Sequence, residues 1–242
     1  MAPDSGFGII GLGRIGAALA HHALEKEHTR GGMRRRGPPP DLVAAGMVGV
    51  RNVNDFRAEL HPPRVIFLYI PAGPAVDSVL DELAASLDPG DIVVDGGNSY
   101  WGDSIRRHHR MQARGLQFVD VGTSGGIAGA RRGACFMVGG EHAAVEKIAP
   151  LLRALATDGG YVHAGGPGAG HFAKLVHNGI EFGMLQAIAE GFDLLRHYRA
   201  PLDIGGVLQS WRNGSAIRSW LVDLLAEAYG AIETRIGRGR SS

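Results

Sequence analysis

The strongest constraint on the fold is an alternation of short apolar segments with helix-like stretches, which runs to about residue 165. The opening segment, "FGIIGLGRIGAALAHHALEK", has the pattern of a strand, a glycine-rich turn and a helix. Further strands are predicted at "RVIFLYIPAG", "DIVVDGGNS" and "QFVDVGTSGG", and helices at 75–87, 101–114 and 141–155. Strands that alternate with helices of this length form parallel βαβ units. The sequence therefore predicts an α/β fold with a doubly wound, mostly parallel sheet.

The strand pattern stops near Gly168, and the rest of the chain carries helical patterns alone. These helical patterns cover 168–198, 203–212 and 216–230. We therefore expect two domains, an α/β domain over residues 1–166 and an all-helical domain over residues 167–242.

The glycine-rich turn has the pattern G-x-G-x-x-G, formed by Gly11, Gly13 and Gly16. In this motif the first glycine allows a tight turn, the second lets the backbone approach a pyrophosphate, and the third permits close packing of helix and strand. The helix N-terminus adds N–H groups and a positive dipole end. The context predicts a Rossmann-type dinucleotide site for NAD or NADP. Its predicted cofactor-binding residues are Gly11, Leu12, Gly13, Arg14, Ile15 and Gly16.

Residues 29–40, "TRGGMRRRGPPP", leave the choice between NAD and NADP open. A Rossmann second strand ends here in an acidic residue that holds the ribose 2′-hydroxyl, or in an arginine that accepts a 2′-phosphate. Glycines and arginines replace the β-branched residues of a buried strand in this segment. Arg34, with Arg35 and Arg36, favours a phosphate clamp and NADP. A solvated basic loop or a locally altered sequence fits the same residues equally well.

Two loops that follow predicted strands offer further cofactor and substrate contacts. Ligands of open α/β sheets bind outside the carboxyl ends of the strands. In "IPAG", Pro71, Ala72 and Gly73 are expected to cover the cofactor, although a plain turn fits them as well. In "DGGNS", Asn98 can donate and accept hydrogen bonds, which suits a bridge between the nicotinamide amide and the substrate. An Asx-turn is the structural alternative for Asn98.

A third loop, "GTSGG", combines a hydroxyl group with exposed backbone N–H groups. Ser124 supplies the hydroxyl, and Gly125 and Gly126 supply the N–H groups. Such a loop can bind a carboxylate or a hydroxyl-rich substrate. These three residues are therefore predicted to bind substrate.

The segment "KLVHNGIE" places Lys174, His177, Asn178 and Glu181 at positions i, i+3, i+4 and i+7. In a helix these positions share one face. A solvated polar stripe on an amphipathic helix accounts for the same spacing. The loops described above favour a functional face, because this helix is expected to enter the same crevice.

Taken together, these motifs resemble the decarboxylating 6-phosphogluconate dehydrogenases, and most closely their short bacterial form. The resemblance rests on "GLGRIG", "DGGNSY", "DVGTSGG", "GAGHFAKLVHNGIE" and "GSAIRSWL". The β-hydroxyacid dehydrogenases share the architecture and a similar Ser-Gly-Gly loop. Those enzymes typically carry Lys-x-x-Asn-Asn on the long helix, whereas this chain has Lys-x-x-His-Asn-Gly-Ile-Glu.

The resemblance implies oxidative decarboxylation of 6-phosphogluconate to ribulose 5-phosphate and CO2, with reduction of NAD or NADP, in the pentose phosphate pathway. It implies that Lys174 is the base and Glu181 the acid of the reaction. His177 and Asn178 are then expected to bind the hydroxyl groups or carboxylate of a sugar-acid phosphate. It also implies a homodimer or a larger homo-oligomer formed through the helical domain.

Two departures from the family pattern put the activity in doubt. The family continues "HNGIEYG", with a tyrosine that contacts the substrate phosphate, where this chain has Phe182. The family's later Gly-x-Gly-Arg/Lys-Trp-Thr and Phe-x-x-Arg motifs, which bind the phosphate end, are absent, so we expect a C-terminally truncated helical domain. A nucleotide-binding protein with impaired catalysis and a dehydrogenase of an unphosphorylated sugar acid or β-hydroxyacid are therefore the alternatives.

Composition limits the remaining classes of function. The net charge of +1 gives no indication of nucleic-acid or membrane-surface binding. The single cysteine, Cys135, forms no internal disulfide, and "VIFLYI" is too short to span a bilayer. The sequence has no cluster with the spacing of a metal site. We expect a cytoplasmic enzyme without a metal, a nucleic-acid partner or a membrane association.

Overall fold

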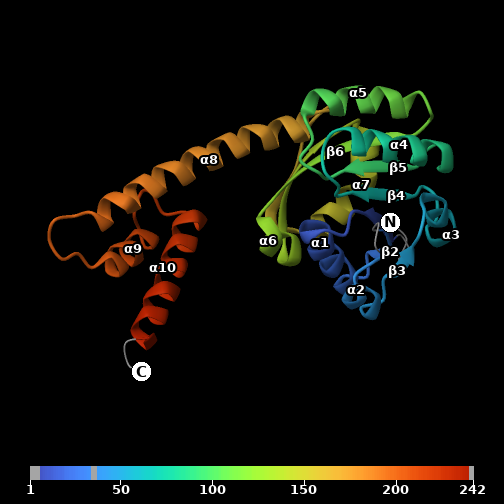
Figure 1. The fold of residues 1–242 in the computed structure, drawn as a ribbon. Coiled ribbons are helices and arrows are strands. Elements are labelled where there is room, and N and C mark those ends of the chain that lie inside the picture. The colour runs from blue at the N-terminus through green and yellow to red at the C-terminus, as the bar shows by residue number, and fades with distance from the viewer. Residues whose placement is uncertain (1–5, 34–36, 240–242) are drawn as a thin grey trace. The chain divides into compact units, whose positions relative to one another are not determined.

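The structure is a computed structural model that describes residues 6–33 and 37–239. The chain divides into two compact units, Met1–Val176 and His177–Ser242. The first unit is built on a sheet and the second is helical (Figure 1).

The described part of the first unit contains one eight-stranded sheet with the order β3-β2-β1-β4-β5-β6-β7-β8. All neighbouring strands are parallel except β6 and β7, which are antiparallel. The expected doubly wound, mostly parallel α/β fold is therefore confirmed. The strands are β1 (Phe7–Ile10), β2 (Thr29–Met33), β3 (Val48–Val50), β4 (Val65–Leu68), β5 (Ile92–Asp95), β6 (Gln117–Ser124), β7 (Ala134–Gly139) and β8 (Ala156–Gly165).

Helices cover both faces of the sheet, and each face has its own apolar core. Strand residues alternate between the two cores: in β4, Val65 and Phe67 pack on one face, and Ile66 and Leu68 on the other. One core includes α1 (Arg14–Glu25), α2 (Pro40–Ala44), α6 (Gly126–Arg132) and α7 (His142–Leu155). The other includes η1 (Val53–Asp55), α3 (Phe56–Glu59), α4 (Pro74–Ser86) and α5 (Trp101–Gln112).

Strand β2 forms despite its glycines, and it lies between β1 and β3. A side chain at Gly32 would collide with the sulfur of Met47. A Cβ at Gly31 would lie 3.2 Å from the ring of Phe56. Glycine is thus favoured, because the side chains of Met47 and Phe56, which follow later in the chain, pack directly onto this strand. The poor strand pattern of 29–33 has a tertiary cause, and Arg34, Arg35 and Arg36 lie outside the described residues.

Three strands were not predicted from the sequence. Strand β3 is short, and β8 is a half-exposed strand at the sheet's edge that contains Gly159 and Gly160. Strand β7, "ACFMVG", is apolar and mostly buried, but it runs antiparallel to β6 and so breaks the βαβ alternation. Its Cys135 is half-buried and has a free thiol.

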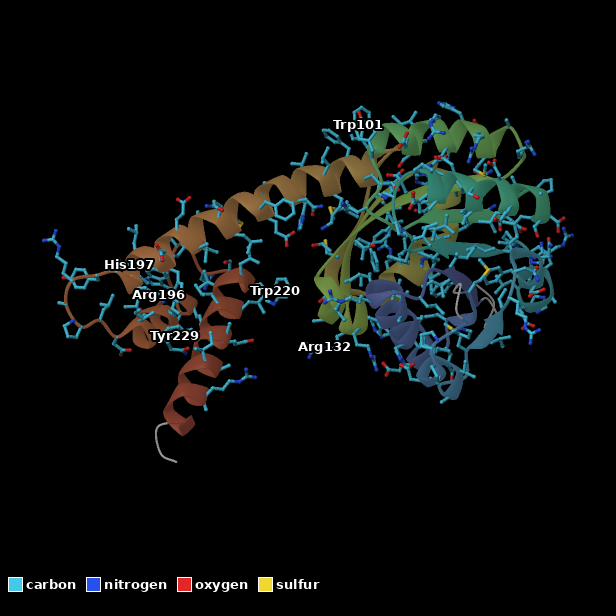
Figure 2. The ribbon with its side chains drawn as sticks, viewed as in Figure 1. Trp101, Arg132, Arg196, His197, Trp220 and Tyr229 are labelled. Atoms are coloured by element: carbon cyan, nitrogen blue, oxygen red, sulfur yellow. The ribbon has the colours of Figure 1, made fainter. Side chains whose placement is uncertain are left out.

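The second unit contains the later part of α8 (Ala169–Arg196), followed by α9 (Ile204–Arg212) and α10 (Trp220–Gly239). Tyr229, labelled in Figure 2, meets Phe192 edge-on with ring centroids 5.8 Å apart. The Nε of Arg212 donates to Asp223 Oδ1 at 2.9 Å. These contacts hold α8, α9 and α10 of this unit together.

An apolar groove of about 410 Å³ lies between α8 and α10 of the helical unit. The groove is lined by Leu185, Ile188, Ala189, Phe192, Asp193, Leu221, Leu224 and Leu225.

None of the helices within the described residues is both long enough and apolar enough to cross a membrane.

Candidate active site

The glycine-rich turn after β1 has the shape that a dinucleotide requires. Gly11 has φ of 102°, and a Cβ there would collide with the carbonyl oxygen of Tyr69. A Cβ at Gly16 would collide with the carbonyl oxygen of Gly11, so the helix packs closely on the turn. By contrast, a Cβ at Gly13 would meet no described atom within 4 Å. The close packing at Gly11 and Gly16 and the open space at Gly13 match the roles of the three glycines in the motif.

The start of α1 fits the phosphates of NAD or NADP. Gly13 is the N-cap residue; no described side chain caps the helix, and its first turn contains no acidic residue. The N–H groups and the positive dipole end of α1 therefore suit an anionic group. Leu12 is buried in the core, Ile15 packs against the core, and the side chain of Arg14 is exposed.

The loop that contains Asn98 is fixed by a carboxylate at the end of β5. Asp95 is fully buried; its Oδ1 accepts from the N–H of Gly97 at 3.1 Å, and its Oδ2 accepts from Ser99 Oγ at 2.7 Å. Asp95 thus forms an Asx-turn at the start of this loop. Asn98 lies between the two donors and is exposed. The sequence reasoning missed Asp95, although a charged residue at the end of an apolar strand was a usable signal.

The other two predicted loops lie at the carboxyl ends of β4 and β6. Pro71 and Ala72 are exposed, and Gly73, with φ of 97°, is the N-cap residue of α4. Tyr69 connects the two loops, because its hydroxyl lies 3.0 Å from Thr123 Oγ1. Strands β1, β4, β5 and β6 are parallel, so the glycine-rich turn and these loops share one edge of the sheet.

The Ser-Gly-Gly loop begins in the last residue of β6. Ser124 is half-buried and is paired in register with Cys135 of β7. Gly125 has φ of 110° and Gly126 has φ of 61°, a conformation that side chains rarely adopt. Two consecutive glycines are therefore required for the turn from β6 into α6.

A buried carboxylate anchors the start of α8. Asp120 of β6 is fully buried and accepts from the N–H of Gly168 at 2.7 Å and from the N–H of His171 at 2.8 Å. The Nδ1 of His171 lies 2.7 Å from Ser104 Oγ of α5. Sequence reasoning missed all three side chains of this anchor. The position of Asp120 within an apolar strand was the available signal.

Lys174 lies directly against β6. A Cβ at Gly122 would lie 2.5 Å from the Cβ of Lys174 and 2.9 Å from the carbonyl oxygen of Gly170. Only glycine at 122 lets α8 approach this closely. Gly122 precedes the Ser-Gly-Gly loop, so the α/β unit brings half-buried Lys174 to the edge that carries the glycine-rich turn and the predicted loops.

The other predicted residues of the long helix belong to the helical unit. His177 Nδ1 lies 3.6 Å from Glu181 Oε2 and 3.3 Å from Asn178 Oδ1. All three side chains are half-buried, whereas Phe182 is 67% exposed. Helix α8 is unbroken from Ala169 to Arg196, so the expected helical spacing is present. Among the described residues, no group of three or more His, Cys, Asp or Glu side chains is placed to hold a metal ion.

Comparisons with known proteins agree with this geometry. Residues 6–165 match the NAD-binding domain of 6-phosphogluconate dehydrogenase, and residues 170–235 match the C-terminal domain of the same enzyme. The chain is also 42% identical to a Haloferax volcanii NAD(+)-dependent, decarboxylating 6-phosphogluconate dehydrogenase, over 92% of this chain and 74% of the relative. The chain belongs to the 6-phosphogluconate dehydrogenase family. Residues 6–165 therefore form the NAD-binding domain of an oxidoreductase family.

Solved structures place the fold in the same group. A Plasmodium falciparum 6-phosphogluconate dehydrogenase, studied with NADP+ and with 6-phosphogluconate, superposes with a TM-score of 0.81 at 29% identity. The alignment covers 92% of this chain but only 50% of the Plasmodium falciparum enzyme. A Mycobacterium tuberculosis 3-hydroxyisobutyrate dehydrogenase gives a TM-score of 0.73 at 25% identity, over 90% of this chain and 73% of that chain. This member of the family thus spans about half the length of the longer 6-phosphogluconate dehydrogenases.

Proposed function

We propose that this chain catalyses the oxidative decarboxylation of 6-phosphogluconate to ribulose 5-phosphate and CO2 with reduction of NAD+ or NADP+. The observation that carries the proposal is the close packing of Lys174 on Gly122, at the edge of the sheet that carries the glycine-rich turn. This position suits a base that acts beside a bound nicotinamide. The family membership supports the same chemistry.

In the proposed reaction, Lys174 takes the proton of the C3 hydroxyl of the substrate. A nicotinamide cofactor held at the glycine-rich turn would supply the acceptor for the hydride of C3. The 3-keto acid that results loses its C1 carboxylate as CO2. Glu181 then donates a proton to the former C2 of the substrate, which becomes C1 of ribulose 5-phosphate. Seven residues of helix separate base and acid, a rise of about 10 Å that is comparable to an extended pentose chain. His177 and Asn178 are proposed to bind the hydroxyl groups or carboxylate of the substrate.

The loops are proposed to complete the site. Asn98 bridges the nicotinamide amide and the substrate, and Ser124 with Gly125 and Gly126 binds the substrate. Pro71, Ala72 and Gly73 cover the cofactor. We assign residues 1–166 to cofactor binding and residues 167–242 to substrate binding and dimerisation. Exposed apolar side chains such as Trp220, at 53%, support a homodimer or larger oligomer, which the molar mass from light scattering tests. The proposed location is the cytoplasm.

The test is the initial rate of reduced-nicotinamide formation with 6-phosphogluconate, measured with NAD+ and NADP+ in parallel. Lys174→Ala and Glu181→Gln are expected to lower kcat by about 10²–10⁴-fold, the usual contribution of a general base or acid. Lys147→Ala and Glu190→Ala are matched controls on exposed helix positions and should keep full activity. Turnover that survives Lys174→Ala would contradict the assigned base.

Phe182 favours a second candidate, a dehydrogenase of an unphosphorylated sugar acid. Its ring cannot donate the hydrogen bond that the family tyrosine gives to the substrate phosphate. Gluconate in place of 6-phosphogluconate discriminates between the two, since equal kcat/KM for both acids would favour the second candidate. Cofactor binding without turnover of either acid would instead identify a catalytically impaired protein.

A further inference from the structure

A buried arginine of α5 contacts the start of α4. Arg107 has no exposed side-chain surface. Its Nε donates to Asp77 Oδ1 at 3.1 Å, and its Nη2 donates to Asp77 Oδ2 at 3.1 Å and to the carbonyl oxygen of Gly73 at 3.0 Å. The guanidinium therefore holds both the N-cap residue and the first turn of α4, directly after the loop 71–73.

The same guanidinium reaches the neighbouring loop. Arg107 Nη1 lies 3.5 Å from Asp95 Oδ2, and both side chains are fully buried. Asp95 in turn accepts from the N–H of Gly97 and from Ser99 Oγ, the two groups on either side of Asn98. One planar cation thus contacts both loops, through a hydrogen bond to Gly73 after β4 and through an ion pair without a hydrogen bond to Asp95 at the end of β5.

The charges around Arg107 make this arrangement rigid. Asp77 also pairs with Arg106 at 3.2 Å and with Arg110 at 3.4 Å, so three arginines of α5 face one carboxylate. The hydrogen bond from Arg107 is the largest cause that lowers the pKa of Asp77 to about 2, so this carboxylate is charged at neutral pH. A bidentate guanidinium–carboxylate pair has one strongly preferred geometry. A buried charge without its partner is costly, so the two loops are held at fixed positions around Arg107.

We propose that Arg107 is a positioning residue, which sets the loop 71–73 against the cofactor and Asn98 against cofactor and substrate. The proposal rests on the proposed function for the roles of these loops, but cofactor affinity tests it without turnover. Arg107 itself is buried and touches neither ligand. It acts through Gly73 and Asp95.

The experiment compares Arg107→Met with Arg106→Met in the full chain. Arg106 is 52% exposed and pairs with the same Asp77 and with Asp103 rather than with Gly73 or Asp95, so it is a matched control. The measurements are the dissociation constant of the reduced nicotinamide cofactor from its fluorescence, KM and kcat with 6-phosphogluconate, and the thermal midpoint. Arg107→Met is expected to lower kcat/KM by about 10²-fold, as for a displacement of about 1 Å at reacting groups. Arg107→Met should also weaken cofactor binding. In Arg106→Met the cofactor dissociation constant, KM and kcat should stay within about twofold of wild type, and only the thermal midpoint should change.

Two outcomes overturn the proposal. In the first, Arg107→Met folds and has the same cofactor affinity, KM and kcat as Arg106→Met. That result would give Arg107 a purely structural role, because such a role changes the thermal midpoint alone. If Arg107→Met does not fold, Arg107→Lys is the second variant, because it keeps the buried positive charge and removes the bidentate guanidinium geometry. Unchanged cofactor affinity and kcat/KM in Arg107→Lys is the other overturning outcome. Wild-type protein that binds cofactor but turns over no acid refutes the proposed function and leaves the cofactor-affinity arm to decide on Arg107.

Discussion

Replacing Gly122 with alanine is expected to displace the proposed base from its position. The new Cβ would lie 2.5 Å from the Cβ of Lys174 and 2.9 Å from the carbonyl oxygen of Gly170. Carbon atoms in ordinary contact are about 3.5–4.0 Å apart, so α8 must move away from β6 by about 1 Å or more. A move of this size strains the bonds from Gly168 and His171 to Asp120, which anchor the helix at 2.7 and 2.8 Å.

The magnitude follows from this geometry. Overpacking a close contact costs about 1–3 kcal/mol of stability, so the urea midpoint of Gly122→Ala should fall. A misplacement of about 1 Å at the reacting groups lowers turnover by about 10²-fold. Cofactor affinity should change much less, because the turn from Gly11 to Gly16 lies on another strand. The expected signature is a large loss in kcat with nearly normal cofactor binding.

The assay is the initial rate of nicotinamide reduction at saturating cofactor, with fluorescence titration of the cofactor and urea denaturation of the same samples. Gly191→Ala, also in α8, is the control: a Cβ there meets no described atom within 4 Å. Alanine should stabilise that helix position by up to about 1 kcal/mol and leave kcat unchanged. A folded Gly122→Ala protein with wild-type kcat would refute the argument that contact with β6 sets the working position of Lys174.

Two further predictions follow from single side chains. The pKa of Asp77 is lowered from 3.8 to about 2, chiefly by the hydrogen bond from Arg107. Because the folded pKa lies below the unfolded one, this carboxylate stabilises the fold above about pH 4 by up to about 2 kcal/mol, and the contribution is lost as the pH falls towards 2. Urea midpoints between pH 5 and pH 2.5 should therefore fall less steeply in Asp77→Asn than in wild type, and equal slopes would contradict the assignment. Phe182→Tyr should lower KM for 6-phosphogluconate by roughly two- to tenfold, as one net hydrogen bond of about 0.5–1.5 kcal/mol does. The KM for gluconate should stay constant, and an equal change for both acids would show that the new hydroxyl does not reach a phosphate.

The sequence predicts those strands whose signal is local. Strands β1, β4, β5 and β6 are apolar runs that end in glycine or proline loops, and each was expected where it occurs. Strand β2 was left open, because its glycines are explained only by Met47 and Phe56, which follow later in the chain and pack onto it. The antiparallel β7 departs from the alternation on which the prediction rested, so its apolar sequence alone did not identify it.

The site residues likewise divide into those with a local sequence signal and those whose role depends on a distant partner. The rule that ligands bind at the carboxyl ends of parallel strands was enough to predict that the loops around Asn98 and Ser124 share an edge. The carboxylates that fix the site were missed; a carboxylate in an apolar strand was their only local signal, and the role of each depends on a partner distant in sequence. Asp95 pairs with Arg107, and Asp120 holds the start of a helix that begins 49 residues later at Ala169. A carboxylate in an apolar strand indicates a buried charge, but what it holds in place is known only once its partner is known.

The division of α8 between the two units bears on the order of the proposed steps. Lys174 belongs to the α/β unit, as does the glycine-rich turn, whereas Glu181 belongs to the helical unit. In the proposed reaction, oxidation at C3 requires the base and the cofactor, and the residues proposed to act as base and to hold the cofactor both belong to the α/β unit. Protonation of the former C2 requires the acid, which enters after CO2 has left. Glu181→Gln should therefore slow a step that follows the oxidation. One equivalent of reduced cofactor per active site should still form rapidly in Glu181→Gln, whereas Lys174→Ala should form none. Rapid formation in neither variant would mean that the acid is already needed for oxidation, and that the helix face acts as one unit from the first step.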